Sequence, residues 1–138
     1  MWWLYLKNFI DEANMDVNTV IGYCKSGYQK SKFKKLKKGD LRIEARFDLH
    51  HVKNRNEALA ELEHKLPLFQ LNDQLVILVI HGKGNGVVKE VCDKHFQYNP
   101  MVLAYHSAQP KDGGAGAVYV HLKNINKTNN FDEYYEEE

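Results

Sequence analysis

The chain has 138 residues, of which 43% are hydrophobic and 27% are charged, as expected of a single globular domain with its own core. Its two cysteines form neither a metal-ligand pattern nor a disulfide framework, which favours a reducing, cytoplasmic location. Residues 1–6, MWWLYL, lack a basic leader and are followed by polar residues, so we expect neither a signal peptide nor a membrane span.

The net charge of +1 hides an uneven distribution along the chain. Five acidic residues lie within positions 132–138, and subtracting their five negative charges from +1 leaves the rest of the chain at +6. Residues 25–38 contain seven lysines and no acidic residue. Charge alone is equally compatible with nucleic-acid contact and with a solvated lysine-rich segment.

Residues 1–40 are predicted to form an N-terminal extension. Within residues 2–15, Trp3, Leu6 and Phe9 recur at roughly helical spacing, which predicts a short amphipathic helix. Residues 16–40 show no clear period and end in the basic run FKKLKKGD, which we interpret as an extended arm.

A strand and a helix are predicted next. Across residues 41–49 apolar residues alternate with charged ones, which predicts a strand with one buried face. Asp48 and His50 lie two positions apart where this strand ends, so they project to the same side. Asn54 is a good N-cap for the following helix, and Pro67 is predicted to stop it.

The chain is organised around LVILVIHGKGNG, residues 75–86. The apolar run, rich in Val and Ile, predicts a strand that is covered on both faces. A helix is predicted over residues 87–96, so the glycine loop leads into a helix N-terminus, where free amides favour an anion. His81 lies at the carboxyl end of the strand, where open α/β sheets bind their ligands.

Residues 101–105 and 117–122 are predicted strands, joined by a polar loop that contains GGAG. The order β-α-β-α-β-β predicts an α/β fold class, an α+β two-layer sandwich with helices packed against a mixed sheet. We expect residues 41–123 to form the domain and residues 124–138 to be a disordered acidic tail.

Asp48 and His50 are candidates for acid–base chemistry, because a carboxylate can fix the tautomer of an imidazole and raise its pKa. A structural role for this pair is the alternative. His81 and Lys83 place an imidazole and a positive charge where an anion would bind. The predicted phosphate-binding residues are Gly82, Lys83, Gly84, Gly86, Gly113, Gly114 and Gly116 of the two glycine loops, with Lys34, Lys35, Lys37 and Lys38 of the basic arm.

Other motifs do not fit. GKGNG has the spacing of neither a P-loop nor a dinucleotide-binding loop. His50, His51 and His81 are candidate metal ligands, but neighbouring strand residues point to opposite sides, so His50 and His51 would not share a site. We therefore predict no metal site.

Three segments together, FDLHH (47–51), VIHGKGNG (79–86) and GGAGAVYVHL (113–122), resemble the small MutS-related (Smr) domain. That family typically has LDLHG, then HGKG, then a GGxG-containing loop before the last strand. The basic segment before FDLHH also resembles stand-alone bacterial members, so the resemblance covers roughly residues 28–123. It implies a fold similar to the C-terminal domain of translation initiation factor three.

The resemblance implies nucleic-acid cleavage, since some Smr domains nick DNA and others cut messenger RNA on stalled ribosomes. The catalytic Asp-Leu-His motif of the family falls on Asp48 and His50, and the HGKG loop, residues 81–84, shapes the phosphate site. Two departures stand out: His51 replaces the usual glycine, and Val118 replaces the usual threonine.

We therefore expect an endonuclease that cleaves RNA, in which His50 is oriented by Asp48, while His81 and the glycine loops hold the phosphate. The alternatives are a DNA-nicking endonuclease that needs Mg²⁺ or Mn²⁺, and a nucleic-acid-binding module that cleaves nothing. We expect no tightly bound cofactor, with nucleic acid as the partner and the ribosome as a further candidate partner.

Overall fold

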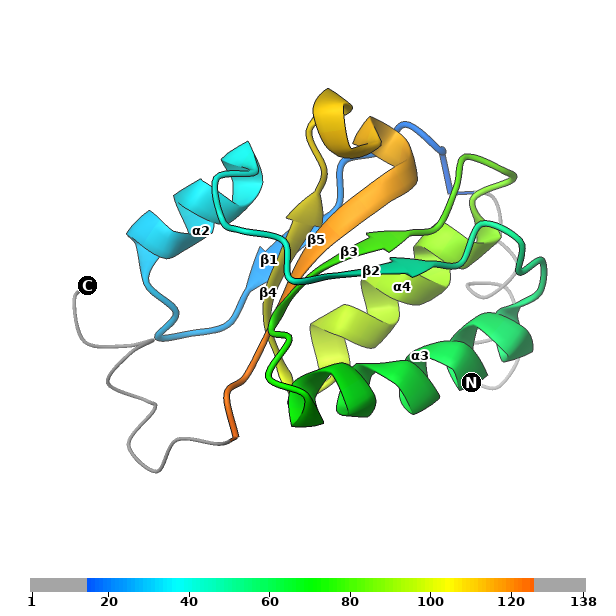
Figure 1. Cartoon of the computed structure of the whole chain (residues 1–138). Coiled ribbons are helices and arrows are strands. Elements are labelled where there is room, and N and C mark those ends of the chain that lie inside the picture. Colours follow the sequence, from blue (N-terminus) through cyan, green and yellow to red (C-terminus); the bar gives the residue numbers. More distant parts are fainter. Residues whose placement is uncertain (1–14, 126–138) are drawn as a thin grey trace, which may run out of the picture.

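The computed structural model describes residues 15–125, which form one five-stranded sheet with helices on both faces (Figure 1). The helix predicted within residues 2–15 and the tail predicted after residue 123 lie almost wholly outside this range. The elements in chain order are β1 (Gly22–Cys24), α2 (Lys30–Lys38), β2 (Ala45–Asp48), α3 (Arg55–Leu71), β3 (Val76–Ile80), α4 (Val87–Tyr98), β4 (Val102–Ser107), two short 3₁₀ turns (Pro110–Asp112 and Gly114–Gly116) and β5 (Ala117–Leu122).

The strands lie in the order β1-β4-β5-β3-β2. Only β2 and β3 pair in parallel; the β3–β5, β4–β5 and β1–β4 pairs are antiparallel. From β2 to β5 the chain follows the predicted β-α-β-α-β-β order, which confirms the fold class. Among residues 15–125, no helix has the length and apolar character needed to cross a membrane.

Strand β3 is covered on both faces, as its apolar sequence predicts. Ile77 and Val79 pack into the core that includes Leu62 of α3 and Phe96 of α4. The alternate residues pack into a second core on the other face, with Leu36 of α2. Because side chains alternate along a strand, an uninterrupted apolar run is the pattern of a strand buried on both sides.

The basic segment before β2 is not the extended arm predicted from the sequence. Residues Lys30–Lys38 form α2, with Leu36 buried and its lysines directed mainly to solvent. Gly39 ends the helix in the left-handed conformation with φ 73°, and its amide donates to the carbonyl oxygen of Leu36 at 3.1 Å. Most residues of this short helix are lysines and only Leu36 is buried, so the sequence shows no helical period. This is why the helix was not predicted.

Helix α3 begins as predicted, because the side chain of Asn54 accepts a hydrogen bond from the amide of Glu57 at 2.8 Å. The predicted stop at Pro67 is wrong, since α3 continues to Leu71. A proline inside a helix removes one backbone hydrogen bond. The turn after it is nevertheless held to the sheet, because buried Gln70 donates through Nε2 to the carbonyl oxygen of Lys123 at 2.9 Å.

Some strand boundaries also differ from the predictions. Strand β2 begins at Ala45 rather than residue 41, because the carboxylate of Glu44 accepts the amides of Leu75 and Val76 at 2.7 and 3.1 Å. The alternation of exposure nevertheless persists through residues 41–49. Strand β4 runs on to Ser107, which pairs with Val118, so the loop predicted from residue 106 starts later.

Candidate functional site

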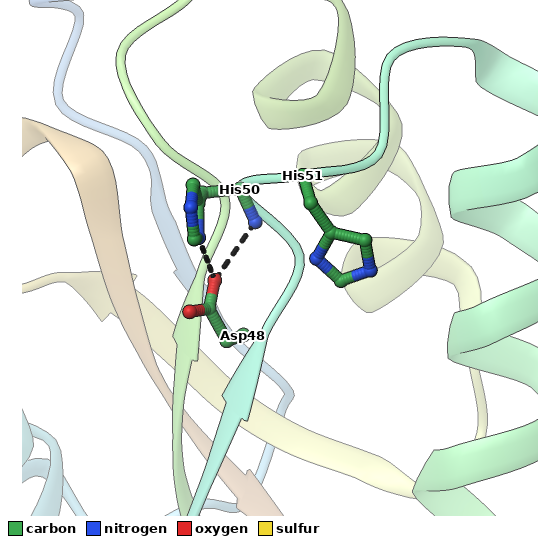
Figure 2. Close-up of side chains that lie close together, drawn as sticks. All are labelled: Asp48, His50 and His51. Atoms are coloured by element: carbon green, nitrogen blue, oxygen red, sulfur yellow. Dashed lines mark hydrogen bonds and ion pairs between the residues drawn. The ribbon is translucent and has the colours of Figure 1, made fainter.

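Asp48 and His50 lie together at the carboxyl end of β2 (Figure 2). The Nδ1 atom of His50 is 2.5 Å from Oδ1 of Asp48, and the backbone amide of His50 donates to the same oxygen at 2.9 Å. Both side chains are open to solvent, with 64% of His50 and 50% of Asp48 exposed. The predicted proximity of the two residues is therefore confirmed, at a place that a substrate can reach.

The hydrogen bonds to Asp48 favour its ionised form. The backbone amide of His50 first, and its side chain second, hold the pKa of Asp48 below the ordinary value for an aspartate. An ionised Asp48 accepts the Nδ1–H of His50, which leaves the Nε2 lone pair available to take a proton. The arrangement is therefore suited to general base catalysis.

His81 lies at the carboxyl end of β3, next to β2 in the sheet, but its side chain is only 4% exposed. Its Nδ1 is 2.9 Å from the carbonyl oxygen of Gly82, so Nδ1 carries the proton and donates. Burial lowers the pKa of His81 to about 4, which keeps the ring neutral at neutral pH. Its Nε2 is buried and has no partner within residues 15–125, so it offers a hydrogen-bond acceptor rather than a positive charge.

A pocket of ≈ 200 Å³ opens between the ends of β2 and β3 and the N-terminus of α4. The first turn of a helix has amides without intrahelical partners, and its dipole favours negative charge. Two of the lining residues are lysines and none is acidic. The lining residues are His50, Val52, Lys53, His81, Gly82, Gly84, Asn85, Gly86, Val88 and Lys89. The pocket is therefore chemically suited to an anion.

The two predicted glycine loops meet at this pocket. The carbonyl oxygen of Gly116 accepts the amides of His81 and Gly82 at 3.0 and 2.9 Å. Gly116 also faces Lys83, since a Cβ placed there would lie 3.3 Å from Cγ of that lysine.

The amides of the second loop have partners within the fold. Those of Gly113, Gly114 and Gly116 donate to the carbonyl oxygens of Pro110, Gln109 and Gly113. This loop therefore supports the first one, while the hydrogen-bond donors beside the pocket belong to the segment that leads into α4.

The lysines of α2 do not enter the pocket. Lys34, Lys35 and Lys38 line a separate hollow on the other face of the sheet, and Lys37 lies over the ring of Phe33 at 5.3 Å. Helix α2 is joined to the second glycine loop, because Gln109 donates through Nε2 to the carbonyl oxygen of Lys37 at 2.7 Å. The predicted basic residues therefore form a surface next to the loop, outside the pocket that contains His50.

Two residues near the site were not predicted to belong to it. Lys89, in the first turn of α4, is 2% exposed, and its Nζ donates to the carbonyl oxygen of Val17 at 2.8 Å. Burial lowers the pKa of Lys89. Nothing in the local sequence distinguishes this lysine from a surface lysine, because the segment that buries it lies 72 residues away along the chain.

His51 is the second, and here the prediction from strand alternation is wrong. Strand β2 ends at Asp48, and the amide of Val52 donates to the carbonyl oxygen of Leu49 at 3.0 Å, which makes residues 49–52 a turn. The rings of His50 and His51 consequently lie 6.0 Å apart, at the same end of β2 as the Asp48 carboxylate (Figure 2). One potential ligand atom from each of these three residues lies within 4.8 Å of the other two.

Comparison with known proteins relates the chain to one family. The Smr domain family matches residues 47–123. The chain is 34% identical over 116 residues to the ribosome rescue factor SmrB of Aeromonas hydrophila, covering 83% of this chain and 66% of that protein. It is 29% identical over 98 residues to SmrB of Shewanella baltica, of which it covers 55%. The chain thus spans less than two thirds of these relatives.

Further matches are to the endonuclease MutS2. The chain is 36% identical over 80 residues to the protein of Streptococcus pneumoniae, which corresponds to 58% of this chain and 10% of that protein. The crystal structure of the Smr domain of Thermus thermophilus MutS2 has a TM-score of 0.54 at 25% identity, over 57% of this chain and 98% of that domain.

One solved structure is similar over most of the chain. YdaL, a stand-alone small MutS-related protein from Escherichia coli, has a TM-score of 0.70 at 24% identity, over 87% of this chain and 98% of that one. This likeness extends the agreement in fold beyond the residues that the family match covers.

Proposed function

This chain belongs to the Smr domain family, and on that premise we propose that it is an endonuclease that cleaves the phosphodiester bonds of RNA. The observation that carries the proposal is the hydrogen bond between Asp48 and His50, beside a pocket whose lining contains two lysines and no acidic residue. The pair supplies a base, and the pocket supplies a place for the phosphate.

In the proposed reaction, Nε2 of His50 removes the proton of a ribose 2′-hydroxyl group. The 2′-oxygen then bonds to the adjacent phosphorus, and the bond from phosphorus to the 5′-oxygen of the next nucleotide breaks. The leaving 5′-oxygen takes up a proton from the protonated imidazole or from solvent. The products are a 2′,3′-cyclic phosphate and a 5′-hydroxyl group, and Asp48 stabilises the positive charge that His50 carries in between.

Negative charge that develops on the phosphate needs stabilisation in the transition state. We assign this to Lys53 of the pocket lining and to Lys83 of the adjacent glycine loop, together with the amides that precede α4. His81 is neutral and is assigned a different part, as an acceptor for a hydroxyl group of the substrate. Its hydrogen bond to Gly82 also keeps the shape of the loop.

We assign the RNA backbone on either side of the cleaved bond to the surface of α2, where Lys34, Lys35 and Lys38 lie together. The relatives named as ribosome rescue factors motivate a more specific proposal, that the RNA is cleaved while it is bound to a ribosome. Neither the proton transfer by His50 nor the stabilisation of the phosphate requires a metal ion in this proposal.

A second candidate function is nicking of duplex DNA with Mg²⁺ or Mn²⁺. Its support is the similarity to the relatives named endonuclease MutS2. The Smr family match, residues 47–123, contains Asp48, His50 and both glycine loops. In this alternative a divalent ion would activate water as the nucleophile.

The test uses one oligonucleotide sequence prepared as RNA, as single-stranded DNA and as duplex DNA, each incubated with and without EDTA. Wild-type protein is expected to cleave RNA in EDTA and to leave cyclic phosphate ends, and His50→Ala to lose that activity. His64→Ala, which removes an exposed histidine of α3, is the matched control and is expected to cleave normally. RNA cleavage that persists in His50→Ala, or DNA nicking that EDTA abolishes without any RNA cleavage, would overturn the proposal.

A further inference from the structure

Asp48, His50 and His51 form a compact group of metal-binding side chains. Within residues 15–125 they are the one group of three or more His, Cys, Asp or Glu residues whose ligand atoms all lie within 4.8 Å of one another. All three residues are exposed, and Figure 2 shows their side chains gathered at the end of β2, with the carboxylate of Asp48 next to the ring of His50. The group therefore has the donors of a metal site and open positions for water or a ligand.

The turn at residues 49–52 creates this arrangement. Had β2 continued, the side chains of His50 and His51 would project to opposite faces of the sheet. The hydrogen bond from the amide of Val52 to the carbonyl oxygen of Leu49 closes the turn, and the two rings come to lie edge to face, 6.0 Å apart. His51 stands where the Smr pattern usually has glycine, so the third donor is a property of this chain.

We propose that Asp48, His50 and His51 bind a divalent transition-metal ion, with Zn²⁺ as the ion that fits the donor set best. Two imidazole nitrogens and one carboxylate oxygen are a common ligand set of Zn²⁺ sites that keep an open position. The same set suits other first-row ions such as Co²⁺. Mg²⁺ instead prefers an octahedral shell of oxygen atoms and retains its water, so it is a poor match for this group.

The side chains can reach the geometry that the ion requires. Ligand atoms about 2.1 Å from a tetrahedral ion lie about 3.4 Å from one another. The three atoms here are within 4.8 Å, so each has to move by a small amount. The side chains of Asp48 and His50 are at least half exposed, and rotation about their side-chain bonds meets little resistance from packing.

Metal binding has a consequence for the proposed RNA cleavage, and this consequence rests on that proposed function. An ion that occupies an oxygen of Asp48 and a nitrogen of His50 removes these atoms from acid–base chemistry. Zn²⁺ is therefore expected to inhibit cleavage, while Mg²⁺ at the same concentration leaves it unaffected. His51 supplies the third ligand and so makes the protein sensitive to Zn²⁺.

Binding is tested directly on the full, untagged chain, without any nucleic acid. Co²⁺ is titrated into the protein while the visible absorption of the bound ion is recorded, and Zn²⁺ is then added to displace it. Wild-type protein is expected to bind one ion per chain. His51→Gly, which restores the residue usual in the family, is expected to bind more than about tenfold more weakly, since even changes around the ligands cost 10- to 100-fold in affinity.

His64→Gly is the matched control, because it removes an exposed histidine of α3 that is not one of the three proposed ligands, and it is expected to bind like wild type. Thermal unfolding in EDTA checks that each variant is folded. Equal affinity of wild type and His51→Gly, or displacement of Co²⁺ by Mg²⁺ as readily as by Zn²⁺, would overturn the metal site.

The cleavage assay separates this inference from the proposed function. Each protein is compared with its own rate in EDTA, and Zn²⁺ is expected to inhibit wild type at concentrations that leave the relative rate of His51→Gly unchanged. Activation of wild type by Zn²⁺, together with normal Co²⁺ binding, would support the metal site and contradict the metal-free mechanism. Absence of cleavage under all conditions would contradict the proposed function, and the binding experiment would still decide the metal site.

Discussion

The amide of Gly82 donates a hydrogen bond to the carbonyl oxygen of Gly116 at 2.9 Å. This bond joins the loop after β3 to the loop before β5, two segments that the sequence separates by more than a helix and a strand. It also places Gly82 directly beside the turn that carries His50, because a Cβ on Gly82 would lie 3.2 Å from Cβ of that histidine. The position of the proposed base therefore depends on glycine at residue 82.

Replacement of Gly82 by alanine is expected to destabilise the protein and to displace His50. Gly82 has φ +82°, a left-handed conformation that costs a residue with a Cβ about 1–2 kcal/mol, and the added methyl group would press on His50. Gly84→Ala is the control for stability, since Gly84 has an ordinary φ and a Cβ there meets no heavy atom within 4 Å among the described residues. Urea unfolding measures both variants, and equal losses of stability would contradict this account of the loop.

Asp48→Asn is expected to lower the rate of RNA cleavage by about 10²- to 10⁴-fold, the usual contribution of a positioned acid–base group. Asparagine can still accept the amide of His50, but it cannot stabilise a protonated imidazole with a negative charge. Single-turnover cleavage measures the rate, and RNA affinity is determined separately. Asp73→Asn is the control, because Asp73 lies in the turn before β3 with φ 60°, which asparagine tolerates. A normal rate for Asp48→Asn would exclude a catalytic part for the carboxylate.

Much of the domain from residue 41 onwards could be predicted from local patterns. Strand alternation, the cap at Asn54 and the apolar run of β3 act over a few residues, and each appears in the structure where the sequence places it. The approach of Asp48 to His50 is likewise a local consequence of their spacing at a strand end.

Two of the features that could not be predicted depend on contacts between distant segments, and a third depends on where a strand ends. Helix α2 packs through buried Leu36 and partly buried Phe33 against strands that follow it in the sequence, and the turn of α3 after Pro67 is held by the hydrogen bond from Gln70 to Lys123. His51 joins Asp48 only because the strand ends before it. Short periodic patterns carry no information about where such an ending falls, and this explains the wrong prediction that His50 and His51 point apart.

Leu36→Ala tests whether the basic segment is part of the folded core. The side chain of Leu36 is 1% exposed and packs with Tyr28, Leu78 and Leu103 on the face of the sheet away from α3. Its truncation is expected to lower the free energy of unfolding by about 2–4 kcal/mol. Lys34→Ala, on the exposed side of the same helix, is expected to change it by less than about 0.5 kcal/mol. An extended arm would instead make the two variants equally stable in urea unfolding.

The double variant Lys34→Gln, Lys38→Gln tests the surface proposed to bind the RNA backbone. Each phosphate contact with a single strand contributes about 0.7 to the slope of log K against log salt concentration. The variant is therefore expected to bind RNA more weakly at low salt and to reduce this slope by up to about 1.4, whatever the RNA sequence. The control double variant, Lys65→Gln with Lys123→Gln, removes the same charge from α3 and from the residue that follows β5. Identical salt slopes for the two double variants would assign the affinity to another surface.

Two buried histidines, His81 and His121, are expected to contribute to the pH dependence of stability. Burial lowers the pKa of His81 to about 4 and that of His121 to about 3, whereas an unfolded chain has histidine pKa values of about 6.5. Above about pH 6.5 both residues are neutral in the folded and unfolded chains, so they add no pH dependence. As the pH falls further, the unfolded chain takes up protons that the folded protein cannot accept. Stability should therefore decrease by up to about 1.4 kcal/mol per pH unit for each histidine.

His121→Asn is the variant that isolates one of these histidines. The ring nitrogen Nδ1 of His121 lies 2.6 Å from the hydroxyl group of Tyr28, and the amide of asparagine can take the place of that nitrogen without a titratable group. The free energy of unfolding is measured with urea between about pH 7 and about pH 5. Its slope against pH should be smaller than that of wild type, by nearly one proton at the lower pH. His64→Asn, an exposed position on α3, should leave the slope unchanged. If the free energy of unfolding of His121→Asn depends on pH as steeply as that of wild type, protonation of other groups governs the loss of stability at low pH.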